Sequence, residues 1–272
     1  MRKRIYYIAG VICLAVSGFM FAGTNFSQAV LTNNLISQKT DSSYKDHYHI
    51  GFAMPKNSLR QGSVYMPIYS NHDEQCLQHM AASFGMFGAS ITENHDYFEA
   101  QYGDKTLRLY RYIDYLEYKN IAEYDDTEQI SDETALNLAL NFLEKSLPHP
   151  LIKPYDTKIK HSDDHITVQF VEYLSNIPNR AFPTEVVLDV YGNVISAGHF
   201  FFDYEILGAA DIITARTALT ELPKIVENKV HLTGYQLVYD FEDSVLMPVY
   251  RFWGHTSCGT DFEWDINALR FY

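Results

Sequence analysis

The sequence predicts an α+β fold in which an N-terminal membrane helix precedes repeated units, each made of one helix and an antiparallel sheet. Two similar strings indicate the repeat, Ile213-Thr-Ala-Arg-Thr-Ala-Leu219 and Ile130-Ser-Asp-Glu-Thr-Ala-Leu136. Each string places a hydroxyl side chain, Thr214 or Ser131, where it can cap the first free amides of a helix. Strand-like runs follow both strings, and self-similarity of this kind is typical of internal duplication.

The composition is that of a globular protein with a strongly acidic surface. The chain has 272 residues, of which 47% are hydrophobic and 20% are charged, and its formal net charge is −13. Such a charge repels phosphate backbones and anionic lipid head groups, so nucleic acid is not an expected partner. The length is sufficient for more than one hydrophobic core.

A hydrophobic segment near the N-terminus predicts export. Residues 5–22 carry no charge, and Arg2-Lys3-Arg4 precede them. Basic flanks stay in the cytoplasm, so everything after the segment is expected outside. Two alternatives remain open: residues 1–29 form an uncleaved anchor of a single-pass membrane protein, or they form a signal peptide cleaved near Ser27-Gln-Ala29, which releases a secreted protein.

Changes in composition divide the remaining chain into regions. Residues 30–72 are polar and irregular, which is typical of a stalk beside a membrane that leads into irregular strands. The other predicted regions are an N-terminal helix-hairpin unit at 73–128, a first repeat unit at 129–211 and a second repeat unit at 212–272.

Apolar periodicity and turn residues predict the individual elements. The last helix is expected to present Leu219, Leu222 and Val226 on one face. The full set comprises a helix at 74–87, a hairpin with strands at 96–102 and 106–118, a helix from 130 that stops at Pro148-His-Pro150, strands at 166–174, 185–190 and 194–202, a helix from 214 that ends by Gly234, and strands at 235–241, 246–253 and 261–266.

Two cysteines, Cys76 and Cys258, lie in the part that is expected outside, and they allow three interpretations. In an exported protein the simplest is one disulfide between them. The second is two unlinked thiols. The third is a zinc site in which Cys76 and Cys258 are joined by His79 and His255, because sulfur and imidazole are the ligands that zinc prefers.

The string Pro248-Val-Tyr-Arg-Phe-Trp253 is a candidate interaction strand. Its aromatic and basic side chains could serve a strand that pairs with the edge of a partner's sheet. The alternative is a core strand in which Arg251 and Trp253 alternate with Tyr250. Pro248 would lie at the start of either strand.

The recognisable catalytic motifs are missing from the sequence. It contains no Gly-x-Ser-x-Gly elbow, no Gly-x-x-x-x-Gly-Lys loop and no His-Glu-x-x-His pair. We therefore predict no catalytic residue, no cofactor and no small-molecule substrate, and we expect a protein that is not an enzyme.

Together the basic N-terminus, the membrane segment, the Ile-Thr-x-x-x-Ala-Leu helix start, the Pro-Val-Tyr-Arg-Phe strand and the Val187-Leu-Asp-Val-Tyr-Gly-Asn-Val194 run resemble PepSY-like domains. More particularly, they resemble the YycH/YycI regulatory proteins of Gram-positive bacteria. The resemblance covers roughly residues 90–272 by architecture, although only these short strings match. Residues 30–72 and the cysteines match nothing in the family.

This resemblance implies a non-enzymatic, membrane-tethered extracytoplasmic regulator that modulates a sensor histidine kinase controlling cell-wall metabolism. The implied partners are the membrane and the sensor kinase or a companion regulatory protein, and the family supplies no catalytic residue. The alternative implied by a cleaved signal is a secreted PepSY-type module that binds or inhibits an extracellular peptidase.

Overall fold

The computed structural model describes residues 48–52, 61–122, 128–147, 151, 154–222 and 230–270. The membrane segment expected at 5–22, and with it the choice between anchor and signal peptide, lies outside the described residues. Val226 and the Pro148-His-Pro150 string, where the second helix was expected to end, also lie outside the described residues. Within the described ranges, no helix has the length and apolar character needed to cross a membrane.

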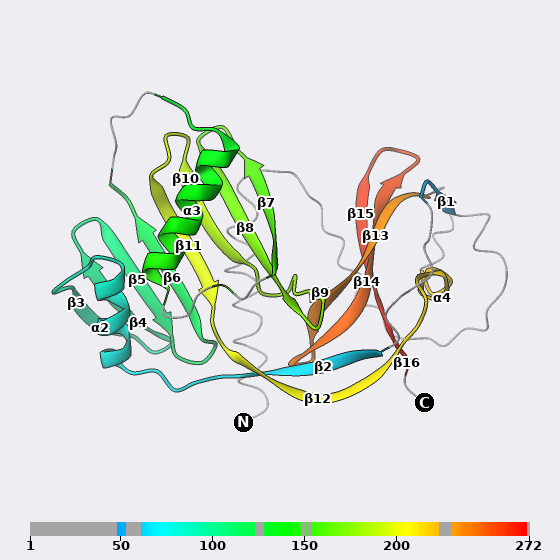
Figure 1. Cartoon of the computed structure of the whole chain (residues 1–272), viewed down its shortest axis with the longest axis horizontal. Coiled ribbons are helices and arrows are strands. Elements are labelled where there is room, and N and C mark those ends of the chain that lie inside the picture. Colours follow the sequence, from blue (N-terminus) through cyan, green and yellow to red (C-terminus); the bar gives the residue numbers. More distant parts are fainter. Residues whose placement is uncertain are drawn as a thin grey trace. The chain divides into compact units, whose positions relative to one another are not determined.

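The described chain is mostly β and forms two sheets with few helices (Figure 1). The larger, nine-stranded sheet has the order β3-β4-β5-β6-β11-β10-β8-β7, with the short β9 paired to β8. All of its pairs are antiparallel. Its strands are β3 Ser90–Glu93, β4 Tyr97–Tyr102, β5 Lys105–Tyr110, β6 Tyr115–Asn120, β7 Tyr155–His161, β8 His165–Leu174, β9 Ile177–Pro178, β10 Thr184–Asp189 and β11 Val194–Phe200.

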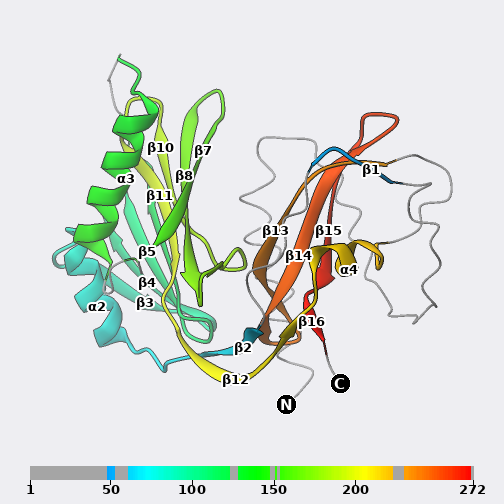
Figure 2. The same cartoon turned by 45° about the vertical axis from the view of Figure 1, so that its right-hand side comes forward.

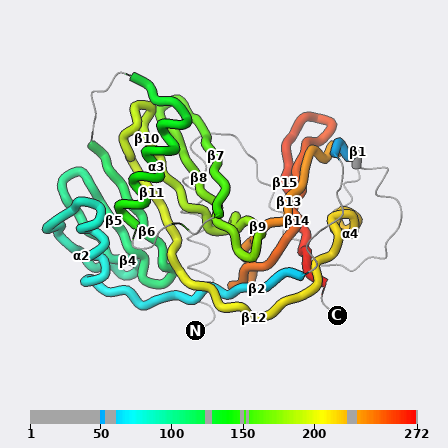
Figure 3. Tube along the Cα trace, in the orientation of Figure 1, coloured from blue at the N-terminus to red at the C-terminus, as the bar shows by residue number. Residues whose placement is uncertain are grey.

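The seven-stranded sheet has the order β1-β13-β14-β2-β12-β16, and β15 pairs with β14. Only the β1–β13 pair is parallel among its described pairs. Figure 3 shows β2 and β12 running side by side, as their antiparallel pairing requires. The strands are β1 Tyr48–Ile50, β2 Gln61–Ile68, β12 Asp203–Ile212, β13 Val230–Glu242, β14 Val245–Thr256, β15 Asp261–Asn267 and β16 Leu269–Arg270.

Two helices cover one face of the nine-stranded sheet, α2 Glu74–Ser83 and α3 Asp132–Ser146 (Figure 2). The Ser131 hydroxyl accepts the Thr134 amide at 3.3 Å, so α3 begins with the expected cap. The apolar cores under α2 and α3 share side chains, so both helices lie on the same face. The shared residues are Phe142, Leu147, Val194 and Ala197.

The seven-stranded sheet carries the third helix, α4 Ala215–Leu219. The Thr214 hydroxyl accepts the Thr217 amide at 3.1 Å, which confirms the predicted cap. The core beneath α4 is rich in rings that come from the strands themselves. These rings belong to Tyr235, Tyr250, Phe252, Phe262 and Trp264.

A helix followed by an antiparallel meander therefore occurs three times in the described chain: α2 with β3 to β6, α3 with β7 to β11, and α4 with β13 to β15. The first two groups do not form separate sheets, because β6 pairs with β11 and joins them. The order of elements agrees with the expected repeat, while duplication and the exact domain boundaries stay predictions.

Several predicted elements need correction. The strand expected at 106–118 is two strands, because Asp114 adopts a φ of 44° and the chain turns between β5 and β6. Gly234 does not end a helix; it lies inside β13, at a shift in the pairing register. The helix from 74 stops at Ser83, before Gly85, which has a φ of 70°.

The region 30–72 was expected to be a stalk that leads into irregular strands, and the structure describes part of it. Residues 61–68 form β2, a regular strand that pairs with β12 and β14 inside the seven-stranded sheet. Alternating burial along β2 places Tyr65 and Pro67 in the interior. The sequence did not show that this strand is regular, and the strands β7 and β12 were not expected.

Candidate functional site

The face of the nine-stranded sheet opposite α2 and α3 carries a row of polar side chains. Residues directly opposite one another in antiparallel strands point to the same face. The pairing register therefore aligns one residue from each of seven neighbouring strands. In the order of the strands these are Glu99, Arg108, Glu117, Gly198, Glu185, Gln169 and Lys158.

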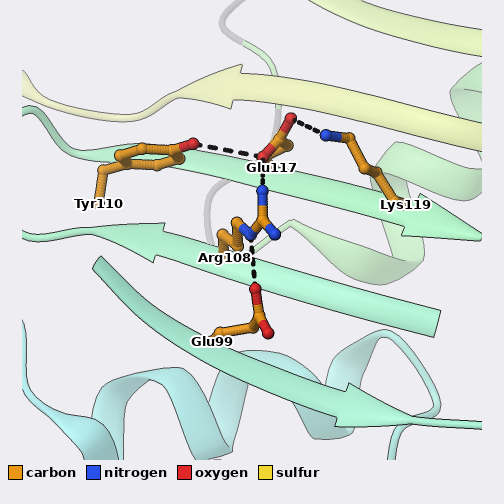
Figure 4. Close-up of polar contacts among 5 residues, drawn as sticks. All are labelled: Glu99, Arg108, Tyr110, Glu117 and Lys119. Atoms are coloured by element: carbon orange, nitrogen blue, oxygen red, sulfur yellow. Dashed lines mark hydrogen bonds and ion pairs between the residues drawn. The ribbon is translucent and has the colours of Figure 1, made fainter. Parts of the chain in front are cut away.

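Glu117 is the centre of the contacts in this row, as Figure 4 shows. Its carboxylate lies 2.7 Å from Lys119 Nζ and 3.5 Å from Arg108 Nη1, and it accepts a hydrogen bond of 3.3 Å from the Tyr110 hydroxyl. Arg108 Nε also donates to Glu99 at 2.6 Å. Only 8% of Glu117 is exposed, so a buried carboxylate is matched here by two cations and a phenol.

An aromatic row runs beside the charged one. Neighbouring rings of Tyr97, Tyr110, Tyr115 and Phe200 have centroids 5.5, 5.5 and 4.5 Å apart. Burial, and secondarily the charge of Glu117, raises the pKa of Tyr110 to about 12. The Tyr110 phenol therefore stays protonated at neutral pH and can donate a hydrogen bond.

Tyr115 bridges the two rows. Gly198 lies between Glu117 and Glu185 in the charged row, and a Cβ at this position would overlap the Tyr115 hydroxyl. Glycine is required here because the phenol occupies the place of its side chain. Burial raises the pKa of Glu185, whose carboxylate accepts a hydrogen bond of 2.9 Å from Gln169. We call these two rows the polar face of the nine-stranded sheet.

A second cluster surrounds Arg251 on the seven-stranded sheet. Arg251 donates to both oxygens of Asp265, at 2.8 and 2.5 Å, and it also contacts Glu263 at 2.9 Å and Asp240 at 3.5 Å. Three carboxylates share one guanidinium, which leaves the cluster negative. Burial raises the pKa of Asp240 from 3.8 to about 6, with Arg251 opposing and Asp265 adding to the shift.

The candidate interaction strand lies inside the sheet. β14 pairs with β13 on one side and with β15 on the other, so it offers no free edge to a partner over residues 249–255. This corrects the edge-pairing interpretation and confirms the core-strand alternative. Pro248 and Tyr250 are buried, whereas Arg251 and Trp253 lie on the opposite face, where Trp253 is 38% exposed and its ring covers Gly234.

The predicted cysteine and histidine set is not assembled. Cys76 and Cys258 are both free. Cys76 belongs to α2 on the nine-stranded sheet, whereas Cys258 lies in the turn between β14 and β15, where it contacts the hydroxyls of Thr256 and Thr260. His79 is exposed on α2, and His255 stacks on His231 with centroids 5.2 Å apart.

Of the three cysteine interpretations, the structure therefore matches two unlinked thiols. The disulfide interpretation is wrong, because both cysteines are free. Among the described residues, no group of three or more histidine, cysteine, aspartate or glutamate side chains is arranged to hold a metal ion.

Sequence reasoning missed the polar face, although part of its signal was present. Alternation of Arg108 and Tyr110 with Leu107 and Leu109 indicates one polar and one apolar face. The alternation cannot show that Glu117 and Glu185 lie on either side of one glycine, because that depends on the pairing of β11 with both β6 and β10.

Comparisons of the sequence with protein-family models and with curated proteins give no match. Among solved structures, the chain is similar to the YpeB C-terminal domain of Bacillus megaterium, with 15% identical residues and a TM-score of 0.46. The match covers 73% of this chain and 93% of that chain.

Proposed function

We propose that this protein is a non-enzymatic, membrane-tethered extracytoplasmic regulator that modulates a sensor histidine kinase through protein–protein contacts. The observation that carries the proposal is the polar face of the nine-stranded sheet. Glu117 is already held by Lys119, Tyr110 and Arg108, so its buried carboxylate is fixed in place beneath the aromatic and charged side chains of this face. A base or nucleophile needs a free lone pair directed at a substrate.

The neighbouring aromatic row supports binding for a separate reason. Tyrosines supply a large contact area and a hydroxyl that donates, at little cost in side-chain entropy. On this face they lie beside alternating positive and negative charges, which can set the register of a partner of complementary charge. A sensor kinase or its companion regulatory protein is the partner we propose, because the sequence resembles YycH/YycI regulators.

Tethering supports the choice of a membrane partner. Arg2-Lys3-Arg4 and the uncharged segment 5–22 favour an anchor that holds the protein in the same membrane as the kinase. Confinement by a short linker raises the effective concentration of a partner to the millimolar range, roughly, so weak contacts are sufficient for regulation.

The test of tethering is to replace residues 1–29 by a signal peptide that is efficiently cleaved. We expect this secreted form to lose kinase-dependent transcription of a reporter. A matched form, in which an unrelated single-span anchor replaces residues 1–29, should retain it. Full regulation by the secreted form would refute the tethered mechanism.

The polar face is tested by a charge reversal with a matched control. Lys119→Glu places a second carboxylate beside Glu117, whereas Lys145→Glu changes an exposed lysine at the end of α3, on the helix side of the sheet. We expect only Lys119→Glu to weaken regulation at an equal amount of folded protein in the membrane. Equal regulation by both variants would exclude this face.

The alternative function is a secreted PepSY-type module that binds or inhibits an extracellular peptidase. Its specific support is the small-residue site Ser27-Gln-Ala29. The intact mass of the mature protein distinguishes the two functions. Loss of residues 1–29 favours the peptidase module, and their retention favours the tethered regulator.

A further inference from the structure

Three side chains outside the polar face and the Arg251 cluster contact one another in series, from a sulfur to a buried carboxylate. Cys76 Sγ lies 3.6 Å from His72 Nδ1, and His72 Nε2 lies 2.6 Å from Asp114 Oδ1. Cys76 is in the first turn of α2, and His72 just precedes the cap of that helix, Asp73. Asp114 comes from the turn between β5 and β6, so the fold brings together residues about forty positions apart.

The imidazole of His72 is held in one orientation. Only 10% of its side chain and 1% of the Asp114 side chain are exposed, and the His72 ring packs on Phe201 with centroids 5.1 Å apart. The Ser70 amide donates to the second oxygen of Asp114 at 2.8 Å, and the Phe201 amide donates to the carbonyl of Asp114 at 3.0 Å. The carboxylate that orients His72 is therefore itself fixed.

This orientation determines which ring nitrogen of His72 presents its lone pair to the Cys76 thiol. An ionised carboxylate only accepts hydrogen bonds, so the proton of a neutral His72 must lie on Nε2. Nδ1 is then an acceptor, and it is the atom that lies next to Cys76 Sγ. The arrangement follows the logic of a nucleophile, a base and an orienting acid.

The surroundings of Cys76 make a base necessary. Burial raises the pKa of this thiol, and the charges of Asp73 and Asp114 raise it further. The resting thiol is therefore protonated at neutral pH, and His72 can accept its proton as attack occurs. Asp114 stabilises the imidazolium that results, and the amides at the start of α2 favour the thiolate.

The geometry favours exchange with a disulfide over acyl transfer. Acyl transfer needs amide donors directed at an oxyanion, and the Cys76 amide already donates to Asp73 at 2.8 Å. Thiol–disulfide exchange needs only a thiolate and access to it. Cys76 is partly exposed to solvent, which exchange with a small disulfide requires.

We propose that Cys76 is a reactive thiol that exchanges with small disulfides, with His72 as its general base and Asp114 as a positioning residue. The Sγ proton passes to His72 Nδ1 while Sγ attacks one sulfur of the disulfide. The disulfide bond breaks, and its other sulfur leaves as a thiolate that takes the proton from His72. Cys76 is thereby oxidised to a mixed disulfide, and half of the small molecule is reduced to a thiol.

The test uses the full chain in detergent, carrying Cys13→Ser so that only Cys76 and Cys258 react. Neutral 4,4′-dithiodipyridine is the probe, and the released thiopyridone is followed by its absorbance. Cys76→Ser and Cys258→Ser assign the two kinetic phases. We expect His72→Ala to slow the Cys76 phase by about tenfold or more. The Cys258 phase is the internal control and should not change.

The pH profile tests the role of His72 without a variant that could fail to fold. The ionisable groups around Cys76 and His72 are Asp73, Asp114 and Tyr69, whose phenol also feels the charge of Asp114. A base that takes the thiol proton makes the rate level off once that base is deprotonated, whereas attack by free thiolate keeps rising with pH. We therefore expect the rate at Cys76 to level off between pH 6 and pH 9, roughly, and Asp114→Asn to lower the rate. A rate that rises tenfold per pH unit from 6 to 9, or one unchanged in folded His72→Ala, overturns the proposal.

Discussion

The helices α3 and α4 begin in the same way and differ greatly in length. Ser131 and Thr214 each accept the amide three residues later, and each hydroxyl also contacts the hydroxyl of that residue, at 3.0 and 2.9 Å. Nevertheless α3 has 15 residues and α4 has 5. A cap determines where a helix begins, and the surface that the helix must cover determines how far it continues.

The two sheets differ in the surface that they offer to a helix. The sheet beneath α3 is mostly aliphatic, and α3 contributes Ala135, Ala139 and Leu143 to that core. The sheet beneath α4 fills much of its own core with rings, among which Phe252 and Trp264 are cross-strand partners. Because rings extend further from the backbone than aliphatic side chains, a short helix is sufficient to close the second core.

The comparison is tested most strongly by removing one ring from each sheet. Phe252→Ala and Phe170→Ala each delete a fully buried ring, so each should lower the free energy of unfolding by about 3–5 kcal/mol. Both tryptophans, Trp253 and Trp264, lie in the seven-stranded sheet, so their fluorescence follows that sheet. Among the described residues, α2 and α3 hold most of the helix, so the helical circular dichroism signal that is lost as the sheets unfold comes mainly from them.

We expect Phe252→Ala to shift the fluorescence transition in urea more than the helical transition, and Phe170→Ala to do the opposite. Each variant is the control of the other, because the two deletions are of equal size. If both variants move both transitions equally, the two sheets unfold as one cooperative unit and cannot be treated as separate cores.

The helix caps sharpen the comparison with a smaller effect. Ser131→Ala should cost about 1 kcal/mol, because a long helix loses its first hydrogen bond and its start frays. Thr214→Ala should cost about 0.5 kcal/mol, since little helix follows that cap. Urea denaturation measures both values. A larger loss at Thr214 than at Ser131 would show that the short helix depends on its cap rather than on the rings beneath it.

The smallest expected effect comes from Asp240, one of the three carboxylates that share Arg251. The pKa of Asp240 in the folded protein is about 6 and its ordinary value is 3.8, so the folded state binds this proton more tightly. The stability that results is fully present below about pH 3.8 and is lost as the pH rises through about 6. At pH 8 the Asp240 carboxylate therefore destabilises the fold.

Asp240→Asn should thus leave stability at pH 8 unchanged or raise it by up to about 0.5 kcal/mol, since exposed charges are screened. Asp265→Asn is the matched control. It removes the negative charge and one of the two oxygens that accept from Nε and Nη2 of Arg251, and it should cost about 1 kcal/mol. Denaturation at pH 5 and pH 8 measures both. A loss at Asp240 that equals the loss at Asp265 would contradict the assigned protonation.

Local patterns in the sequence were sufficient for the elements whose cause is local. The caps at Ser131 and Thr214 and the strands β8, β10, β11, β13, β14 and β15 follow from residues within a few positions of one another, whereas β7 was not expected. The break at Asp114 was missed, because the apolar alternation continues through it. Its buried carboxylate is held by Ser70 and His72, which lie far away in the sequence.

The sequence by itself therefore determined where the helices begin, which faces are apolar and that the surface is acidic. Only the tertiary structure decided that β6 joins β11 into one sheet, that Cys76 lies beside His72 and not beside Cys258, and that β14 has no free edge. The physical reason is that capping and alternation act within a few residues, whereas pairing register depends on strands that meet after long loops close.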